Sequence, residues 1–191
     1  LNTNPEPFKP TVASLIKDKK TDEDKIKSIF YWVQDNIRYI AYEDGIAGFK
    51  PDDAQNVYEK KYGDCKGMAN LTKEMLKIAG FDARLTWIGT RQILYDYSIP
   101  SLAVDNHMIC TVVLNDKKYF LDATEDNVSF GDYAERIQNR QVMIENGDKY
   151  ILDKVPTFDK TRNLEQHSYT SKINSELLEG VGKFTLHGET K

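Results

Sequence analysis

The segment YGDCKGMANLTKEMLKIAGFDARLTWI, residues 62–88, decides the fold, because a predicted helix in it gives way to a predicted strand. Asp64 is a good N-cap residue for a helix that starts at Cys65 and ends at Gly80. Cys65 precedes Met68 by one helical turn, so its side chain is expected near the buried side of the helix. The apolar face of that helix consists of Met68, Leu71, Met75, Leu76 and Ala79.

Two further helices are predicted upstream of this segment. Apolar residues recur at helical spacing over residues 21–40. A shorter helix is predicted over residues 53–62, with Gly63 as the residue that ends it. Residues 1–20 begin with a proline-rich stretch and are interpreted as a linker.

Strands dominate the chain after the cysteine helix. Residues 106–115 and 117–124 are predicted as two strands, and Asn115-Asp116 at their junction suits a tight turn. A second hairpin is predicted over residues 141–152, where Asn146-Gly147 is typical of a type I′ turn. Helices followed by antiparallel hairpins predict an α+β fold rather than a parallel βαβ sheet.

The same patterns predict the organisation of the chain. We expect one α+β domain over residues 21–158. Residues 159–191 turn polar and show weak strand patterns. They are interpreted as a β tail that is a candidate for the start of a following domain.

Composition argues against several classes of function. The 191-residue chain has a formal net charge of -4, whereas nucleic-acid binding normally needs a basic face, so no nucleic-acid partner is expected. No apolar run approaches the roughly 18 residues of a transmembrane segment. The 2 cysteines and 3 histidines lack metal-ligand spacing, and no glycine-rich phosphate-binding loop is present. The sequence therefore predicts neither a metal nor another cofactor.

A cysteine at the start of a helix can serve as a nucleophile. Unpaired backbone N–H groups and the positive end of the helix dipole favour a thiolate at this position. The same N–H groups can stabilise the oxyanion that forms when a thiolate attacks a carbonyl group. The alternative for Cys65 is the usual role of a free cysteine, that of a small buried apolar residue. The nucleophile hypothesis therefore needs a base nearby.

The first predicted hairpin supplies a candidate base. If Asn115-Asp116 form a two-residue loop, His107 and Asp122 share one face of the hairpin as diagonal neighbours. Asp122 can then orient the imidazole of His107 and stabilise its protonated form. Cys110 falls on the opposite face and is interpreted as a packing residue. The alternatives are a structural, hydrogen-bonded His107 and an Asp122 that only forms a turn.

The segments around these three side chains resemble the transglutaminase-like superfamily of cysteine enzymes. The resemblance rests on YGDCKGMANLTKEMLKIAGFDARL, residues 62–85, and on DNHMICTVVLNDKKYFLDAT, residues 105–124. It extends over about residues 20–125. It implies a papain-like or transglutaminase-like core, in which the nucleophile helix packs on an antiparallel sheet.

The resemblance also implies roles and surroundings. Cys65 is then the nucleophile, His107 the base and Asp122 its partner. Similar domains occur in multidomain bacterial proteins that are often exported. This implies flanking domains in the same longer chain and an extracytoplasmic location, at the periplasm or the cell surface.

The expected activity is acyl transfer on the amide bonds of a protein or peptide substrate. Water as acceptor makes the enzyme a peptidase or amidase, whereas an amine makes it a transglutaminase. The alternative is a non-catalytic binding or scaffolding module with the same fold in a larger bacterial protein. Candidates for a second oxyanion donor, beside the backbone N–H of Cys65, are Gln55, Asn56 and Tyr62. The loop over residues 91–105 is either a lid or a plain connection, and Trp87 belongs either to the cleft or to the core.

Overall fold

A computed structural model describes residues 4–41 and 44–188 of the chain. The chain divides into two compact units, Leu1–Pro156 and Thr157–Lys191. The first unit contains helices α1 (Lys9–Ile16), α2 (Asp22–Asn36), α3 (Ala54–Lys60) and α4 (Cys65–Ile78). Its main sheet contains β3 (Asp82–Ile88), β4 (His107–Leu114), β5 (Lys117–Leu121), β6 (Gln141–Asn146) and β7 (Lys149–Lys154).

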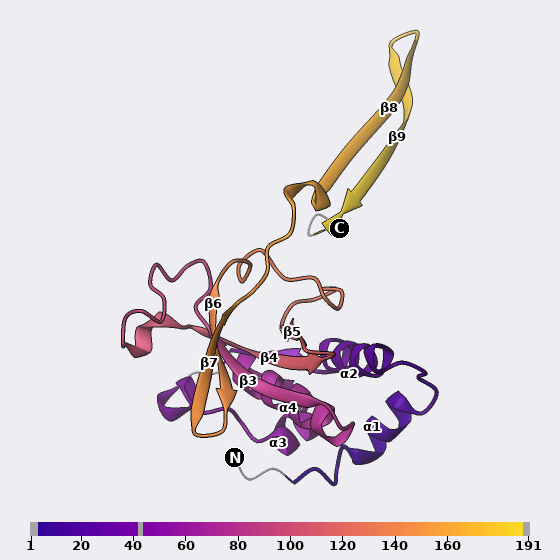
Figure 1. The fold of residues 1–191 in the computed structure, drawn as a ribbon. Coiled ribbons are helices and arrows are strands. Elements are labelled where there is room, and N and C mark those ends of the chain that lie inside the picture. The colour runs from indigo at the N-terminus through magenta and orange to yellow at the C-terminus, as the bar shows by residue number, and fades with distance from the viewer. Residues whose placement is uncertain (1–3, 42–43, 189–191) are drawn as a thin grey trace. The chain divides into compact units, whose positions relative to one another are not determined.

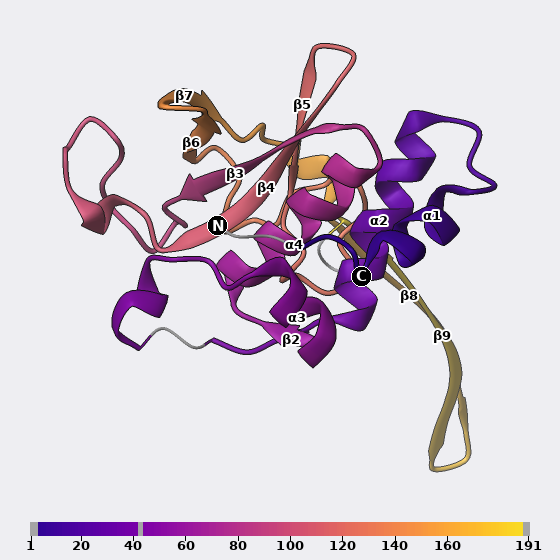
Figure 2. The ribbon, with the colours of Figure 1, turned by 90° about the horizontal axis from the view of Figure 1, so that it is seen from below.

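The main sheet is antiparallel and has the strand order β5-β4-β3-β6-β7. The helices lie on one face of this sheet, with α4 against β3 and β4 (Figure 1). The view from below shows the same arrangement, with α1 and α2 beside one end of α4 (Figure 2). Helices packed on an antiparallel sheet confirm the predicted α+β class.

One apolar core joins the helices to the sheet. Helix α4 contributes Leu71 and Met75, and β4 contributes Cys110 and Val112 on the facing side. Helix α2 begins after Thr21, whose hydroxyl accepts a hydrogen bond from the backbone N–H of Asp24 at 3.1 Å. Its buried face consists of Ile26, Ile29, Phe30 and Val33. The predicted start of α4 at Cys65 is confirmed. Helix α2 lies within the predicted residues 21–40 but ends at Asn36, because Ile37 takes an extended conformation.

Residues 8–16 differ from the linker predicted for residues 1–20. They form the start and body of α1, and the side chains of Phe8 and Val12 are fully buried in the core. Pro10 stands in the first turn, where its fixed φ and missing N–H are compatible with a helix. Burial of two such apolar side chains stabilises the domain by roughly 1.5–3 kcal/mol each, so this segment belongs to the folded unit.

The helix before the cysteine, α3, ends two residues earlier than predicted, at Lys60 rather than at residue 62. Helix α3 stops at Lys60 because Lys61 takes a left-handed conformation with φ 59°. Tyr62 and Gly63 form a short strand, β2, that pairs in parallel with β1 (Arg38–Tyr39). A Cβ atom on Gly63 would lie 3.1 Å from a methyl group of Val57, so this glycine permits close packing rather than capping the helix.

The hairpin of β4 and β5 has the predicted register. Asn115 and Asp116 take positive φ values of 51° and 60°, and Leu114 pairs with Lys117 across a two-residue loop. In the hairpin of β6 and β7, Asn146 pairs with Lys149, so the loop is Gly147-Asp148. The predicted turn at Asn146-Gly147 was therefore one residue too early. Gly147, with φ 63°, stands first in the loop, which is the glycine position of a type II′ turn.

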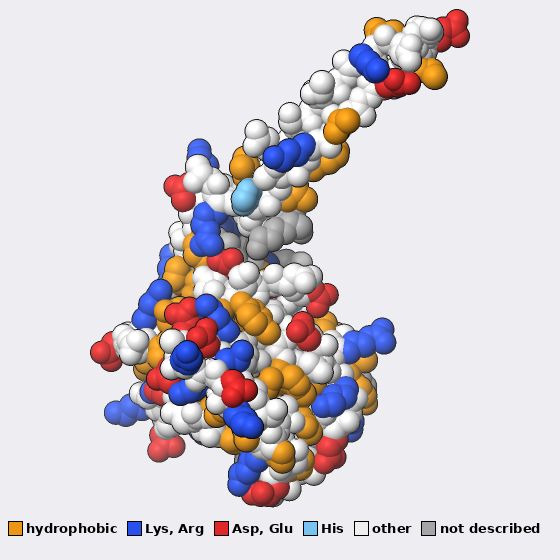
Figure 3. Space-filling view, turned by 90° about the vertical axis from the view of Figure 1, so that its right-hand side faces the viewer, with side chains coloured by type: hydrophobic (Ala, Val, Ile, Leu, Met, Phe, Trp, Pro, Cys, Tyr) orange, Lys and Arg blue, Asp and Glu red, His pale blue; other side chains and the backbone are white. Residues whose placement is uncertain are grey.

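The second unit is a two-stranded hairpin of β8 (Leu164–Asn174) and β9 (Leu177–His187). All eleven residues of β8 are exposed. Hydrophobic side chains, Tyr169 and Phe184 among them, line this hairpin (Figure 3). That this unit begins a following domain stays a prediction. Across both units, no described helix has the length and apolar character that crossing a bilayer requires.

Candidate functional site

Cys65 is the first residue of α4, and its neighbours fix the start of that helix. Asp64 is the N-cap, and its carboxylate accepts a hydrogen bond from the backbone N–H of Gly67 at 2.8 Å. Cys65 is 3% exposed and lies in an apolar cluster with Leu85 and Met108, against which Trp87 packs. The predicted location near the buried side of the helix is confirmed, and Trp87 is partly buried core.

The turn that presents Cys65 is tightly packed. Gly67 faces α3 so closely that a Cβ atom would stand 2.9 Å from a methyl group of Val57. Lys66, whose side chain is almost fully buried, forms an ion pair with Asp64 at 2.5 Å. Because Asp64 caps the helix and pairs with Lys66, both oxygens of its carboxylate hold the turn around Cys65.

His107 and Asp122 are brought together at the end of the first hairpin. His107 is the first residue of β4, and Asp122 follows directly after β5. Nε2 of His107 lies 2.8 Å from Oδ2 of Asp122, and the two side chains are 4% and 2% exposed. The hairpin register accounts for this contact, because it places both residues on one face.

The electrostatics of this pair favour its charged form. Burial alone would lower the pKa of His107, but the carboxylate of Asp122 and a hydrogen bond with Cys65 raise it to about 9. Burial alone would raise the pKa of Asp122, but His107, Arg136 and Thr124 lower it to about 2. At neutral pH the pair is therefore an imidazolium beside a carboxylate, in contact with the thiol of Cys65.

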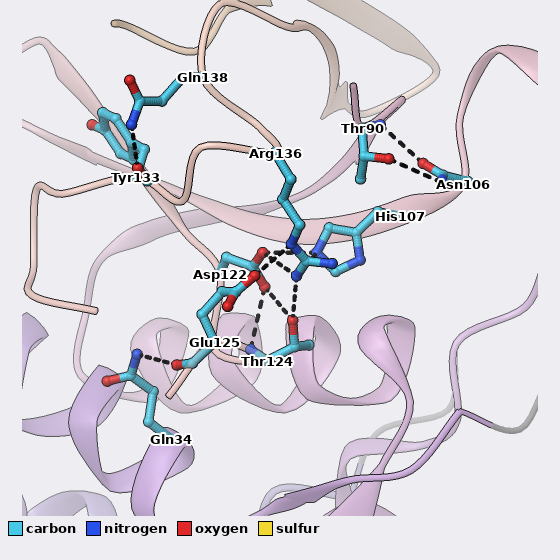
Figure 4. A network of polar contacts seen from close by, with 10 residues as sticks. All are labelled: Gln34, Thr90, Asn106, His107, Asp122, Thr124, Glu125, Tyr133, Arg136 and Gln138. Carbon is cyan, nitrogen blue, oxygen red and sulfur yellow. Dashed lines mark hydrogen bonds and ion pairs between the residues drawn. The ribbon is translucent and has the colours of Figure 1, made fainter. Parts of the chain in front are cut away.

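Arg136 is part of this site and was not identified from the sequence. Its Nη2 atom donates to Oδ2 of Asp122 and to the hydroxyl of Thr124, both at 2.9 Å (Figure 4). The same atom lies 3.3 Å from Nε2 of His107. Its Nε atom forms an ion pair with Glu125 at 2.5 Å. Arg136 lies in the long connection between β5 and β6, which carries no periodic pattern that could have placed it at the site.

The connection between β3 and β4 is fixed directly beside His107. The side chain of Asn106 accepts from the backbone N–H of Thr90 at 2.9 Å and donates to its hydroxyl at 3.1 Å (Figure 4). A Cβ atom on Gly89 would collide with the backbone carbonyl oxygen of Val104. These contacts define where β4 begins and hence where the imidazole stands.

Two of the three candidate oxyanion donors already have hydrogen-bond partners. The amide of Gln55 donates to Glu59 at 2.8 Å, and the amide of Asn56 donates to Asp52 at 3.1 Å. Tyr62 is exposed. It lines a hollow of about 450 Å³ that also includes Asp64, the residue before the cysteine. The role of each as an oxyanion donor stays a prediction.

The predicted lid over residues 91–105 presents apolar side chains to solvent. Leu94, Tyr95, Ile99 and Leu102 are all exposed. The loop is nevertheless anchored in its middle, because the hydroxyl of Tyr97 donates to Asp105 at 3.1 Å and its backbone N–H donates to Gln141 at 2.9 Å. That the loop acts as a lid over a substrate stays a prediction.

The remaining cysteine is a core residue, and the remaining histidines belong to the second unit. Cys110 is fully buried in the core, and burial raises the pKa of its thiol to about 12. His167 and His187 belong to the hairpin of the second unit. No group of three or more potential metal ligands exists within residues 4–41 and 44–188.

Comparison with known families identifies the chain. The sequence profile of the "Transglutaminase-like superfamily" matches residues 9–121, which is more than half of the chain. The chain belongs to this superfamily. Its matched segment contains Cys65 and His107, whereas Asp122 is the residue directly after it. None of the curated protein sequences compared with the chain matches it significantly.

Solved structures share this transglutaminase-like fold. A candidate protease of Parabacteroides distasonis aligns with 82% of the chain at a TM-score of 0.62 and 16% identity. A candidate cysteine protease of Cytophaga hutchinsonii aligns with 63% at 0.50 and 15% identity. Calcium-bound LapG of Legionella pneumophila aligns with 78% of the chain and 80% of its own length, at 0.52 and 14% identity. The chain spans only 29% and 37% of the first two proteins. At these identities the similarity establishes the fold, and the papain-like or transglutaminase-like core is confirmed.

Proposed function

We propose that this transglutaminase-like domain catalyses cysteine-dependent acyl transfer on amide bonds of a protein or peptide substrate. One observation carries the proposal: a buried pair, His107 and Asp122, whose side chains are 2.8 Å apart, interacts with a cysteine at the start of a helix. An imidazolium beside a thiol favours the thiolate, which is the attacking species in cysteine enzymes. Superfamily membership is consistent with this chemistry.

The reaction would proceed in two halves. The thiolate sulfur of Cys65 attacks the amide carbonyl carbon, and the backbone N–H of Cys65 stabilises the resulting oxyanion. His107 donates its proton to the leaving amine as the C–N bond breaks, which leaves a thioester on Cys65. His107 then removes a proton from the acceptor, which attacks the thioester and regenerates the thiolate. Asp122 orients the imidazole and stabilises its protonated form in both halves.

The acceptor decides between hydrolysis and transfer. Water releases an acid and makes the domain a peptidase or amidase, while a primary amine forms a new amide. Two proteins with the same fold are candidate proteases, which supports hydrolysis as the first activity to test. The low exposure of Cys65 supports transfer as the alternative, because a thioester shielded from water survives until an amine arrives.

Alkylation with iodoacetamide between pH 5 and pH 10, located by mass spectrometry, tests the proposal. We expect Cys65 to react fast at pH 6 and roughly 10-fold to 100-fold more slowly in His107→Ala, because an ordinary thiol is only slightly ionised there. Cys110 is an internal control, since a fully buried thiol should stay unlabelled until the domain unfolds. Equal rates for wild type and His107→Ala would overturn the nucleophile assignment. A non-catalytic binding module, which the burial of Cys65 also allows, would then be favoured.

A positive result justifies a substrate screen. Peptides with a fluorogenic amide would be tested with and without an added primary amine, using Cys65→Ser as the inactive control. Release of the amine that depends on Cys65 would establish hydrolysis, and incorporation of the added amine would establish transfer.

A further inference from the structure

The carboxylate of Asp122 is held by more groups than the orientation of a histidine requires. Thr124 binds Oδ1 through its hydroxyl at 2.7 Å and its backbone N–H at 3.2 Å. Oδ2 is shared by Nε2 of His107 at 2.8 Å and Nη2 of Arg136 at 2.9 Å. Because both Asp122 oxygens are occupied, the carboxylate cannot rotate without breaking a contact.

The contact between Arg136 and His107 is repulsive. Nε2 of His107 directs its hydrogen toward Asp122, and Nη2 of Arg136 is also a donor, so the 3.3 Å contact brings two donors together. When His107 is protonated, two positive charges face one carboxylate oxygen. Arg136 therefore opposes the imidazolium directly, and it also reduces the negative charge that Asp122 offers to His107.

The position of Arg136 is built into the fold. Its backbone carbonyl oxygen accepts from the N–H of Arg91 at 2.8 Å, beside the end of β3. Its neighbour Ile137 is fully buried, and Tyr133 and Ala134, shortly before it in the chain, are also buried. The ring of Tyr133 makes an edge contact with Phe120 of β5, with ring centroids 5.9 Å apart. The side chain of Arg136, 39% exposed, thus extends from a packed segment onto the pair.

Among the described residues, Asp122 after β5 and Cys65 at the start of α4 act on the charge of His107. Arg136, from the connection before β6, contacts the imidazole at 3.3 Å. Glu125 faces Arg136 and partly neutralises it. Removal of the charge of Arg136 should therefore be detected most directly as a change in the protonation of the His107 imidazole.

We propose that Arg136 is a positioning residue that locks the Asp122 carboxylate and limits how strongly that carboxylate stabilises the His107 imidazolium. The proposal rests on the function proposed above. A carboxylate that stabilised the imidazolium further would strengthen the thiolate–imidazolium pair but would make His107 a weaker acid toward the leaving amine. Arg136 limits the stabilisation of the imidazolium, so that His107 can still release its proton to the leaving amine after the thiolate has attacked.

The test is the protonation of His107 itself, followed by NMR of the imidazole across pH 5 to 11 in the full chain. In Arg136→Gln the midpoint of the His107 titration should rise by about one pH unit. The shift is modest because the Arg136 side chain is partly exposed and pairs with Glu125. Arg136→Lys keeps the positive charge but lacks the planar guanidinium, so the midpoint of the His107 titration should lie close to that of the wild type. Arg91→Gln is the matched control, because Arg91 lies close by and pairs with Glu135 at the surface. Its midpoint should not move.

A second variant keeps the test valid if Arg136→Gln does not fold. Glu125→Gln removes the charge that neutralises Arg136, so the midpoint of His107 should fall instead of rise. An unchanged or lowered midpoint in folded Arg136→Gln, or an unchanged or raised one in Glu125→Gln, would overturn the role of Arg136. An unreactive Cys65 combined with the expected midpoints would refute only the proposed catalysis, because the NMR readout does not depend on turnover.

Discussion

Replacement of Asp122 by Asn should change the pH dependence of folding stability in a defined way. In the wild type the pKa of His107 is about 9, against an ordinary value of 6.5 in the unfolded chain. A raised pKa contributes stability that is fully present below pH 6.5 and is lost as the pH rises through 9. The difference corresponds to about 3 kcal/mol, at 1.36 kcal/mol for each unit of pKa.

Without the carboxylate this contribution should disappear. In Asp122→Asn burial still lowers the pKa of His107, and of the two interactions that raise it only the one with Cys65 remains, so the pKa should fall far below its wild-type value. Between these pH values the wild type should lose about 3 kcal/mol more stability than the variant. On the acid side, Asp122 itself stabilises the wild type above about pH 4, and that contribution is lost as the pH falls through about 2.

Urea denaturation at pH 6 and pH 9.5 measures the effect. Both tryptophans, Trp32 and Trp87, lie in the first unit, so their fluorescence reports the unfolding of the domain that contains the site. Asp153→Asn is the matched control, because it removes the same charge from a surface ion pair with Lys118. If wild type and Asp122→Asn lose the same stability between the two pH values, within about 1 kcal/mol, the charged state assigned to the pair is wrong.

Three further changes test how the site is supported. Gly67→Ala should destabilise the domain by about 1–3 kcal/mol in urea denaturation, despite the better helix propensity of alanine, because the methyl group meets Val57. Stability equal to that of the wild type would show that α3 moves enough to accommodate the added methyl group. Gly89→Ala should slow alkylation of Cys65, because it displaces the segment at Val104 that leads into His107; an unchanged rate would refute that link. Truncation after Pro156 should leave the alkylation rate of Cys65 unchanged, and a loss of labelling would show that the site needs the second unit.

The parts of the site that obey a periodic pattern could be predicted from the sequence. The helical spacing after Asp64 and the turn at Asn115-Asp116 define where Cys65 begins its helix and which hairpin face holds His107. Both rest on short-range rules, in which a cap or a two-residue loop sets the geometry of the whole element. The contact between His107 and Asp122 follows from that register.

The parts that depend on irregular chain could not be predicted. Arg136 reaches Asp122 because its connection packs through Tyr133 and Ile137, and no spacing rule relates such a segment to a strand. Pro5, Pro7 and Pro10 dominate the pattern around residues 8–16, and such a pattern predicts a linker. Whether a short amphipathic stretch folds depends on the apolar surface offered by its neighbours, which local propensity does not describe.

The separate hairpin of β8 and β9 has a consequence for any measurement of backbone dynamics. Its strands are almost entirely exposed, and two strands that bury so little are marginally stable in water, so in the 191-residue chain its amide hydrogens should exchange with solvent through frequent local opening. The amides of β3 and β4, at the centre of the main sheet, should exchange only when the whole first unit opens. Deuterium uptake should therefore separate the chain near Pro156 into a fast and a slow population, and no single melting temperature should describe both.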